Sequence, residues 1–241
     1  MPPTACRVVA DVHGESTALS AAVTDADGRR LILLGDLVDF GPDPAGVLDC
    51  ALNLVESGRA ILLRSNHDDR LFRHLTRGKT ARRGTLEATL AAIAAHPDAA
   101  RLRERFCAVY QAAPWWLRWG HYLLVHGAMD PLMLEHEAPV APLTGRRRSK
   151  LKWLALYGEG QPAKGPDAFP ERTYNWVQHI PDGITAIVGH DIRSRNEPLT
   201  VVNAHGGRAI FADTGCGKGG RLSWLDLPEE VVGSVPIACE L

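Results

Sequence analysis

The sequence is poor in the features of secreted and membrane proteins. None of its five cysteines belongs to a CxxC pair, which argues against a thiolate zinc site or a disulfide framework and favours a reducing compartment. No apolar run approaches the roughly 18 residues that a membrane helix needs. The N-terminus also lacks a basic segment followed by a long apolar core. We therefore expect a cytoplasmic protein that does not enter a membrane.

The chain also lacks an excess of charge of one sign. Its 27 basic and 28 acidic residues give a formal net charge of −1, so we predict no extended nucleic-acid surface, and any contact with a phosphorylated ligand must be local. Internal repeats and low-complexity tails are absent. With 241 residues, of which 45% are hydrophobic, the chain can bury a sizeable core.

Three short apolar segments each end in polar side chains. RVVADVHG ends in Asp11 and His13, LILLGDLVD in Asp36 and Asp39, and AILLRSNHD in Asn66, His67 and Asp68. Strands are expected at 6–11, 31–34 and 60–63, and helical patterns at 15–23 and 46–57 separate them. This alternation predicts an α/β fold with a parallel sheet, in which such side chains gather at the carboxyl ends of the strands.

The rest of the chain divides into three parts. The alanine-, leucine- and arginine-rich segment 68–112 predicts a helical insertion that caps the site, and WWLRWGHYLLVHG predicts a hairpin whose second strand delivers His126. The segment 129–172 is rich in proline and glycine and is expected to be irregular, with its basic run at 146–148 as a solvated surface. Strands follow at 184–188, 200–204, 209–213 and 222–226, the first of which leads to His190.

The strand-end side chains are typical of a metal centre. They offer carboxylate, imidazole and amide-oxygen ligands, from Asp11, His13, Asp36, Asn66, His126 and His190. This donor set suits a divalent ion such as Mn, Fe or Zn. Since six groups exceed the needs of one catalytic ion, we expect two divalent ions, with Mn favoured, that share one carboxylate. Such centres acidify a water molecule and hydrolyse phosphate esters.

The motifs DVH, GDLVD, NHD, VHG and VGH, in this order, resemble the calcineurin-like metallophosphoesterase superfamily. TLEATL, LYGE, YNW and ADTGCGKGGRL extend the resemblance to the phosphatase domain of bacterial polynucleotide kinase-phosphatases and its free-standing, serine/threonine-phosphatase-like relatives. The resemblance implies one domain over 1–241, built as a two-sheet sandwich with α/β/β/α layers. A GxxxxGK[ST] motif and a ligase-like segment are absent, so we expect the phosphoesterase alone.

The resemblance also implies roles for single residues. Asp11 and His13 would hold the first metal ion, Asp36 would bridge, and Asn66, His126 and His190 would hold the second. His67, oriented by Asp39, would protonate the leaving oxygen or stabilise its charge. Asp213 would lie next to the metal ligands without binding a metal ion itself.

Three positions depart from the family pattern. Phe40 stands where relatives usually place an arginine that grips phosphate, Ser65 where they place glycine, and Ile192 where many place a further histidine. The polynucleotide branch lacks that histidine too. Either another arginine replaces the missing grip, or the preferred substrate is not a simple monoester dianion. The candidates for the grip are Arg64, Arg82, Arg83, Arg193 and Arg195.

The sequence therefore predicts a phosphoesterase that uses metal-bound hydroxide to hydrolyse phosphate monoesters. The expected ligand is a phosphorylated small molecule or the end of a nucleotide or oligonucleotide, for example a 2′- or 3′-terminal or cyclic phosphate. A protein serine/threonine phosphatase and a dinucleoside-polyphosphate hydrolase are alternatives on the same scaffold. A phosphate-binding regulatory module of low turnover is the alternative outside the enzyme class.

Overall fold

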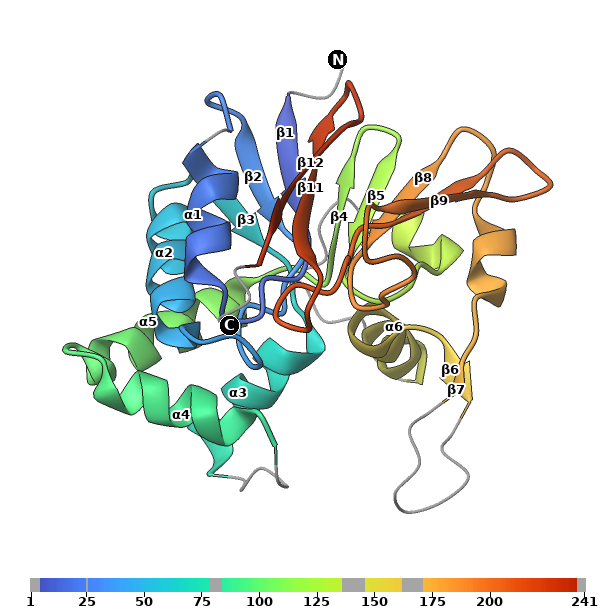
Figure 1. The fold of residues 1–241 in the computed structure, drawn as a ribbon. Helices are drawn as coiled ribbons and strands as arrows, with labels where there is room; N and C mark the ends of the chain where they lie inside the picture. Colours follow the sequence, from blue (N-terminus) through green and yellow to red (C-terminus); the bar gives the residue numbers. More distant parts are fainter. Residues whose placement is uncertain (1–4, 25, 79–83, 136–145, 162–170, 238–241) are drawn as a thin grey trace.

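The first strands of this chain are buried on both faces, which requires a layer of structure on either side. β1 (Cys6–Val9) is buried along its whole length, and β2 (Arg30–Leu33) at every position but its first. The computed structural model describes residues 5–24, 26–78, 84–135, 146–161 and 171–237. In it, two five-stranded sheets pack face to face with helices outside them (Figure 1), which confirms the predicted two-sheet sandwich.

The first sheet has the strand order β12-β11-β1-β2-β3. Strands β1, β2 and β3 run parallel, β11 pairs antiparallel with β1, and β12 pairs antiparallel with β11. The bounds of the remaining strands are Ala60–Leu62 for β3, Arg221–Leu227 for β11 and Val231–Pro236 for β12.

The second sheet has the order β4-β5-β8-β10-β9, in which β5, β8 and β10 run parallel. β4 and β5 form the predicted hairpin. The strands span Trp116–Trp119 for β4, Tyr122–Val125 for β5, Thr185–Val188 for β8, Leu199–Val202 for β9 and Arg208–Phe211 for β10.

Helices cover the outer faces of both sheets. They span Ser16–Thr24 (α1), Pro44–Glu56 (α2), Asn66–Arg77 (α3), Leu86–Ala95 (α4), Ala99–Ala112 (α5) and Arg146–Tyr157 (α6). The segment predicted as a helical insertion forms α3, α4 and α5, of which α4 and α5 contact α2 (Figure 1). Short 3-10 helices at Pro131–Glu135 and Asn175–His179 and a two-stranded ribbon, β6 (Gly160–Gln161) with β7 (Glu171–Arg172), complete the described elements.

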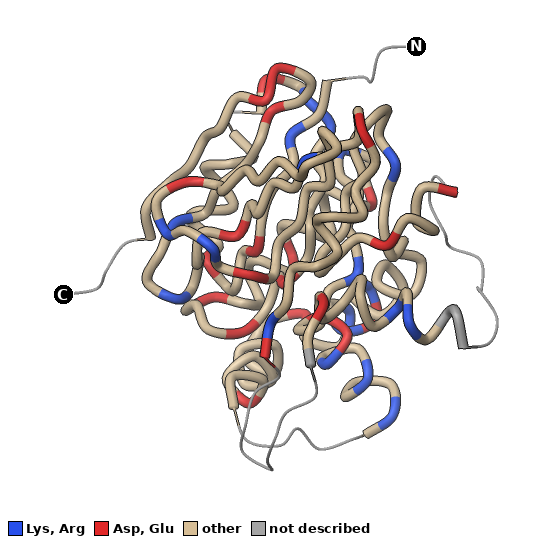
Figure 2. The backbone as a smooth tube through the Cα atoms, turned by 90° about the vertical axis from the view of Figure 1, so that its right-hand side faces the viewer, with Lys and Arg blue, Asp and Glu red and all other residues tan. Residues whose placement is uncertain are grey.

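The alternation of strand side chains produces separate apolar layers. In β2, Leu31 and Leu33 pack outward with α1 and α2, whereas Ile32 packs inward against residues of the second sheet such as Ile187. The outer face of the second sheet packs with α6, through Leu151 among others. No described helix combines the length and apolar character that crossing a bilayer requires, and basic and acidic positions are intermixed in the view of Figure 2.

Two elements differ from the sequence-based expectation. The segment predicted to be irregular contains α6, whose Leu151 and Ala155 lie one helical turn apart and are buried. The basic run at 146–148 begins this helix, and its side chains lie outside the described residues. β12 was not predicted, because Gly233 in its middle weakens the strand pattern. The pairing explains this glycine, since a Cβ at Gly233 would lie 2.3 Å from the ring of Trp224.

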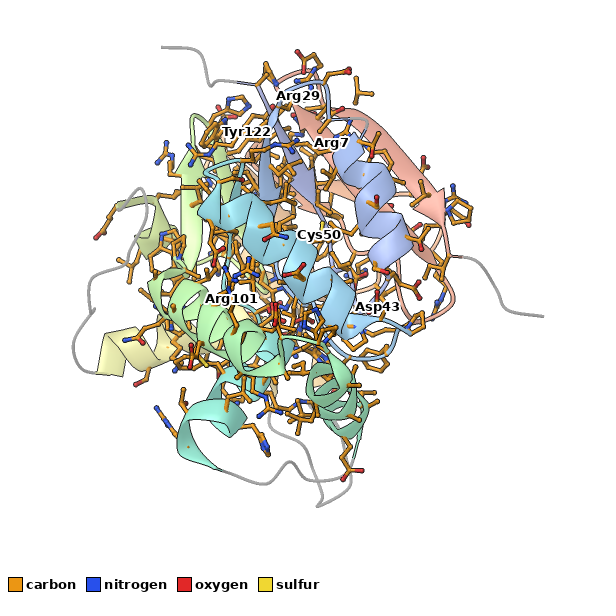
Figure 3. All side chains as sticks on the ribbon, turned by 90° about the vertical axis from the view of Figure 1, so that its left-hand side faces the viewer. Arg7, Arg29, Asp43, Cys50, Arg101 and Tyr122 are labelled. Atoms are coloured by element: carbon orange, nitrogen blue, oxygen red, sulfur yellow. The ribbon has the colours of Figure 1, made fainter. Side chains whose placement is uncertain are left out.

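A buried ion pair joins β1 to β11. The guanidinium of Arg7 donates Nε and Nη2 to the two carboxylate oxygens of Asp226, both at 2.7 Å, and Nη1 to the carbonyl of Ala22 in α1. Figure 3 labels Arg7. Both side chains are largely buried. Removing one partner would leave the other charge buried and unpaired, which is much more costly than losing a surface pair.

We predict that Asp226→Ala lowers the free energy of unfolding by about 3–5 kcal/mol, measured by urea denaturation. The matched control is Glu229→Gln, which breaks the exposed pair between Arg29 and Glu229 and should cost less than about 1 kcal/mol. Equal losses in the two variants would contradict the role assigned to the buried pair.

Candidate metal centre

The strand-end residues predicted from the sequence meet at one edge of both sheets. Parallel strands of the first sheet lead to Asp11, Asp36 and Asn66, and parallel strands of the second lead to His126, His190 and Asp213. Because parallel strands end at the same edge, the packing of the two sheets brings these side chains together.

The carboxylate of Asp36 lies at the middle of this group. Its Oδ2 is 3.7 Å from Nε2 of His13, 3.5 Å from Nε2 of His126 and 3.9 Å from Nε2 of His67. Two groups of side chains could each hold a metal ion, His13 with Asp36 and His67, and Asp36 with His126 and His190. Asp36 belongs to both groups, as a bridging ligand would.

Asn66 and Asp11 complete the arrangement. Oδ1 of Asn66 lies 2.8 Å from Nε2 of His126 and 3.0 Å from Nδ1 of His190, in the second group. Asp11 belongs to neither group, but its Oδ2 lies 4.0 Å from Nε2 of His13. Both of its oxygens accept the backbone N–H of His190. This approach requires glycine at Gly189, where a Cβ would lie 2.2 Å from Oδ1 of Asp11.

Burial sets the protonation of these groups. It lowers the pKa of His13 to about 3 and that of His126 to about 4, and it lowers the pKa of His190 well below its usual value. These imidazoles are therefore neutral near pH 7, in the form that binds metal ions. Burial acts to raise the pKa of Asp36, but the surrounding imidazoles, that of His126 foremost, lower it below its usual range.

The residues present fit divalent metal ions. Nε2 of His13 is fully buried and has no hydrogen-bond partner among the described residues, although it points toward the carboxylates. Burial, together with the negative charges of Asp213 and Asp36, raises the pKa of Asp11 well above its usual range. A cation bound between these carboxylates would offset that cost. Neutral imidazoles, carboxylates and an amide oxygen form the donor set that borderline divalent ions prefer.

A second set of contacts orients His67. Its Nδ1 donates to Oδ2 of Asp39, which also accepts from Arg70. Oδ1 of Asp39 accepts from the hydroxyl of Thr89 at 2.8 Å, and Thr85 accepts from Arg70 at 3.0 Å. Nε2 of His67 is thereby directed to the centre. These contacts give both threonines of the TLEATL motif a partner at the site.

The turns that carry these residues have unusual backbone angles. His13, Asp36, Asp39, Phe40 and His190 all have positive φ values, between 46° and 74°. Such values are uncommon for residues other than glycine and mark functional sites when the surrounding structure enforces them.

Serine in place of glycine at position 65 causes no strain, because its φ is −136°. Its hydroxyl accepts the N–H of Asp36 at 2.8 Å and donates to Asp68 at 2.8 Å. Ser65 therefore holds the turn that presents Asp36.

Three of the five arginines considered for phosphate binding contact other groups. Arg64 donates to the carbonyls of Gln111 and Ala113 at the end of the helical insertion. Arg193 lies over the ring of Tyr174 at 3.9 Å, and Arg195 donates to the carbonyl of Lys218 at 2.6 Å. Arg82 and Arg83 lie outside the described residues.

Three cations at the centre were not predicted from the sequence: Arg70, which donates to Asp39, Lys218 and Arg172. Nζ of Lys218 lies 4.7 Å from the ring centroid of Phe40, which itself lies 4.9 Å from the ring of His13. Nη2 of Arg172 lies 2.5 Å from Nε2 of His190. Lys218 stands within the ADTGCGKGGRL motif and could have been suspected. Arg172 lies in the segment predicted to be irregular, where no pattern singled it out.

We predict that Mn²⁺ raises the thermal midpoint of the wild-type protein by about 5–10 °C at a concentration 100-fold above its Kd, since only the folded chain assembles the donors. Asp36→Asn should lose most of this shift, because Asp36 belongs to both groups. Asp98→Asn, an exposed carboxylate on the surface, is the matched control and should keep it. A full shift in Asp36→Asn, measured against its own metal-free midpoint, would contradict the assignment.

Comparison with known proteins identifies the family of this chain and agrees with its fold. The profile of the calcineurin-like phosphoesterase family matches residues 7–218. A bis(5′-nucleosyl)-tetraphosphatase PrpE [asymmetrical] of Anoxybacillus flavithermus is 31% identical over 214 residues, which cover 87% of this chain and 80% of the relative. The protein of the same name from Bacillus subtilis is 27% identical and covers 95% of this chain and 93% of its own length.

Solved structures show the same fold. A protein proposed to be a diadenosine tetraphosphatase superposes with a TM-score of 0.63 at 22% identity, over 98% of this chain and 96% of its own. A serine/threonine phosphatase from Saccharomyces cerevisiae gives 0.61 at 14% identity, over 100% of this chain and 82% of its own. With its profile match, its relatives and its two-sheet architecture, this chain belongs to the calcineurin-like phosphoesterase family.

Proposed function

We propose that this protein hydrolyses dinucleoside polyphosphates asymmetrically, with the help of two divalent metal ions. The observation that carries the proposal is its similarity, along most of the chain, to proteins named asymmetrical bis(5′-nucleosyl)-tetraphosphatases. This favours the dinucleoside-polyphosphate alternative over hydrolysis of phosphate monoesters, which was the first expectation from the sequence.

The distribution of cations supports this choice. Phe40 replaces the arginine that would grip a single terminal phosphate, and it cannot donate a hydrogen bond. The cations instead contact different parts of the centre: Lys218 lies on the side of His13, Arg70 beside His67 and Arg172 beside His190. Separate positive charges suit a chain of several phosphates better than one terminal dianion.

The metal ions would be held by the six predicted ligands, with Mn²⁺ favoured and Fe or Zn as alternatives. They are Asp11, His13, Asp36, Asn66, His126 and His190. When bound, such ions supply charge neutralisation on the phosphate oxygens and a more acidic water. Buried Asp36, with a lowered pKa, stays ionised to receive them.

His67 is the proposed acid for the leaving oxygen. Asp39 accepts its Nδ1–H, which directs Nε2 toward the centre. Asp39 and Asp36 raise the pKa of His67 although burial acts to lower it, so His67 retains a proton more readily than the buried metal ligands. Water adds to one phosphorus, a bridging P–O bond breaks, and Nε2 of His67 gives its proton to the departing phosphate oxygen.

We predict that the protein, assayed with Mn²⁺, converts diadenosine tetraphosphate to equal amounts of adenosine monophosphate and adenosine triphosphate. Asymmetrical hydrolysis divides the four phosphates of the substrate so that one product carries one phosphate and the other carries three. Ion-exchange chromatography of the products checks this, with Asp36→Asn as the inactive variant and Asp98→Asn as the active one. We expect kcat/KM to exceed that for an aryl phosphate monoester by about 100-fold. Adenosine diphosphate as the sole product, or faster monoester hydrolysis, would contradict the proposal.

A further inference from the structure

A hollow of about 790 Å³ lies beside the candidate metal centre. It is formed by α1, by β12 and by the glycine-rich turn after β10, and its size is within the range of small-molecule sites. Ala18 and Ala21 of α1 and Val235 of β12 give it largely apolar walls, and Phe40 closes the side toward the centre. We call this hollow the base site.

Phe40 is shared by the base site and the metal centre. Its ring lies edge-on to His13 at 4.9 Å and tilted to His67 at 5.4 Å. The side chain is nevertheless 46% exposed, and its φ of 65° directly follows the 74° of Asp39. Two consecutive left-handed residues other than glycine are costly. The structure thus holds a large apolar ring in solvent next to the reacting groups.

A cation lies against the same ring. Nζ of Lys218 lies 4.7 Å from the ring centroid of Phe40. The turn that carries Lys218 is held by Arg195, which donates to the carbonyl of Lys218 at 2.6 Å, and by the N–H of Lys218, which donates to Gly215 at 2.9 Å. The ring of Phe40 therefore contacts the metal centre, a cation and an apolar hollow.

We propose that the base site binds the nucleobase at one end of the polyphosphate chain. Phe40 stacks on the base, Lys218 pairs with the phosphates nearest that nucleoside, and the carboxylate of Glu15, which also lines the hollow, accepts from an exocyclic amino group. The replacement of a phosphate-gripping arginine by Phe40 thereby selects nucleotides over simple phosphate esters. This inference rests on the proposed function and names the part of the substrate that the metal centre does not bind.

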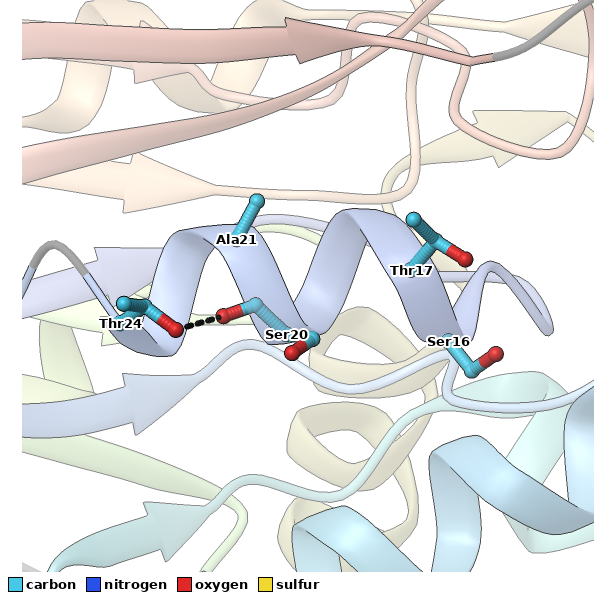
Figure 4. Close-up of a pocket in the computed structure, with 5 residues that line it drawn as sticks. All are labelled: Ser16, Thr17, Ser20, Ala21 and Thr24. Atoms are coloured by element: carbon cyan, nitrogen blue, oxygen red, sulfur yellow. Dashed lines mark hydrogen bonds between the residues drawn. The ribbon is translucent and has the colours of Figure 1, made fainter.

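A neighbouring hollow on α1 lacks these features. It is lined by Ser16, Thr17, Ser20, Ala21 and Thr24, and among these Thr24 donates to the carbonyl of Ser20 at 2.9 Å (Figure 4). Its lining holds only small hydroxyl and methyl groups, with neither an aromatic ring nor a charge. We assign no ligand to it.

The test is calorimetric binding of adenosine 5′-(α,β-methylene)diphosphate, whose P–C–P bridge resists hydrolysis. Phe40→Ala should weaken binding by about 10- to 100-fold, since stacking on an aromatic ring contributes about 1–3 kcal/mol per base. Phe40→Trp should restore most of the affinity. Ala21→Trp, which fills the hollow from α1, should weaken binding as well, and Trp153→Ala, which removes an exposed ring on α6, is the matched control.

Binding of inorganic tripolyphosphate, which has no base, distinguishes a contact of Phe40 with the base from a contact with the phosphates. Its affinity should fall much less in Phe40→Ala than the affinity of the nucleotide analogue does. Equal losses for both ligands would assign Phe40 to the phosphate chain and overturn the base site. Undiminished nucleotide binding in folded Phe40→Ala and Ala21→Trp would overturn it too.

The failure of the base site and the failure of the proposed function are distinguishable. If the wild type hydrolyses diadenosine tetraphosphate and both variants keep its KM, the base site is wrong and the function stands. If the wild type binds the analogue through Phe40 but leaves diadenosine tetraphosphate intact, the proposed function fails while the base site stands.

Discussion

The buried carboxylate of Asp36 is the constraint on which the rest of the site depends. It lies in a left-handed turn, almost without exposure, among imidazoles that come from both sheets. Its N–H is held by Ser65, and one of its oxygens accepts the N–H of His67. A buried carboxylate is tolerated only when its charge is compensated. The sandwich meets this requirement by directing donors from two sheets to one edge.

The same geometry separates chemistry from recognition. The buried imidazoles, among them His13 and His126, are neutral and able to bind metal ions, whereas Lys218 lies against Phe40 and Arg172 contacts His190. Phe40 lies between the metal centre and the base site. In this account the inner groups provide a centre common to the family, and the residues around it decide which phosphate compound is bound.

Much of the centre could be predicted, because each ligand directly follows a strand and the spacing is local. Asp36 and His126 are examples, since each follows an apolar run that predicts a strand. Apart from His67, the partners of Asp39 could not be predicted in this way. Thr89 lies 50 residues away in a helical insertion, and only tertiary packing brings its hydroxyl to the carboxylate. Arg172 could not be predicted either. It contacts His190 from a short ribbon that has no recognisable sequence periodicity.

The most direct test of the central claim is anomalous diffraction from crystals grown with Mn²⁺. The account predicts two peaks per chain, roughly 3.5–4 Å apart, with Asp36 coordinating both ions. One peak should lie next to His13 and the other next to Asn66, His126 and His190. A single peak, or two peaks of which only one is coordinated by Asp36, would contradict the account.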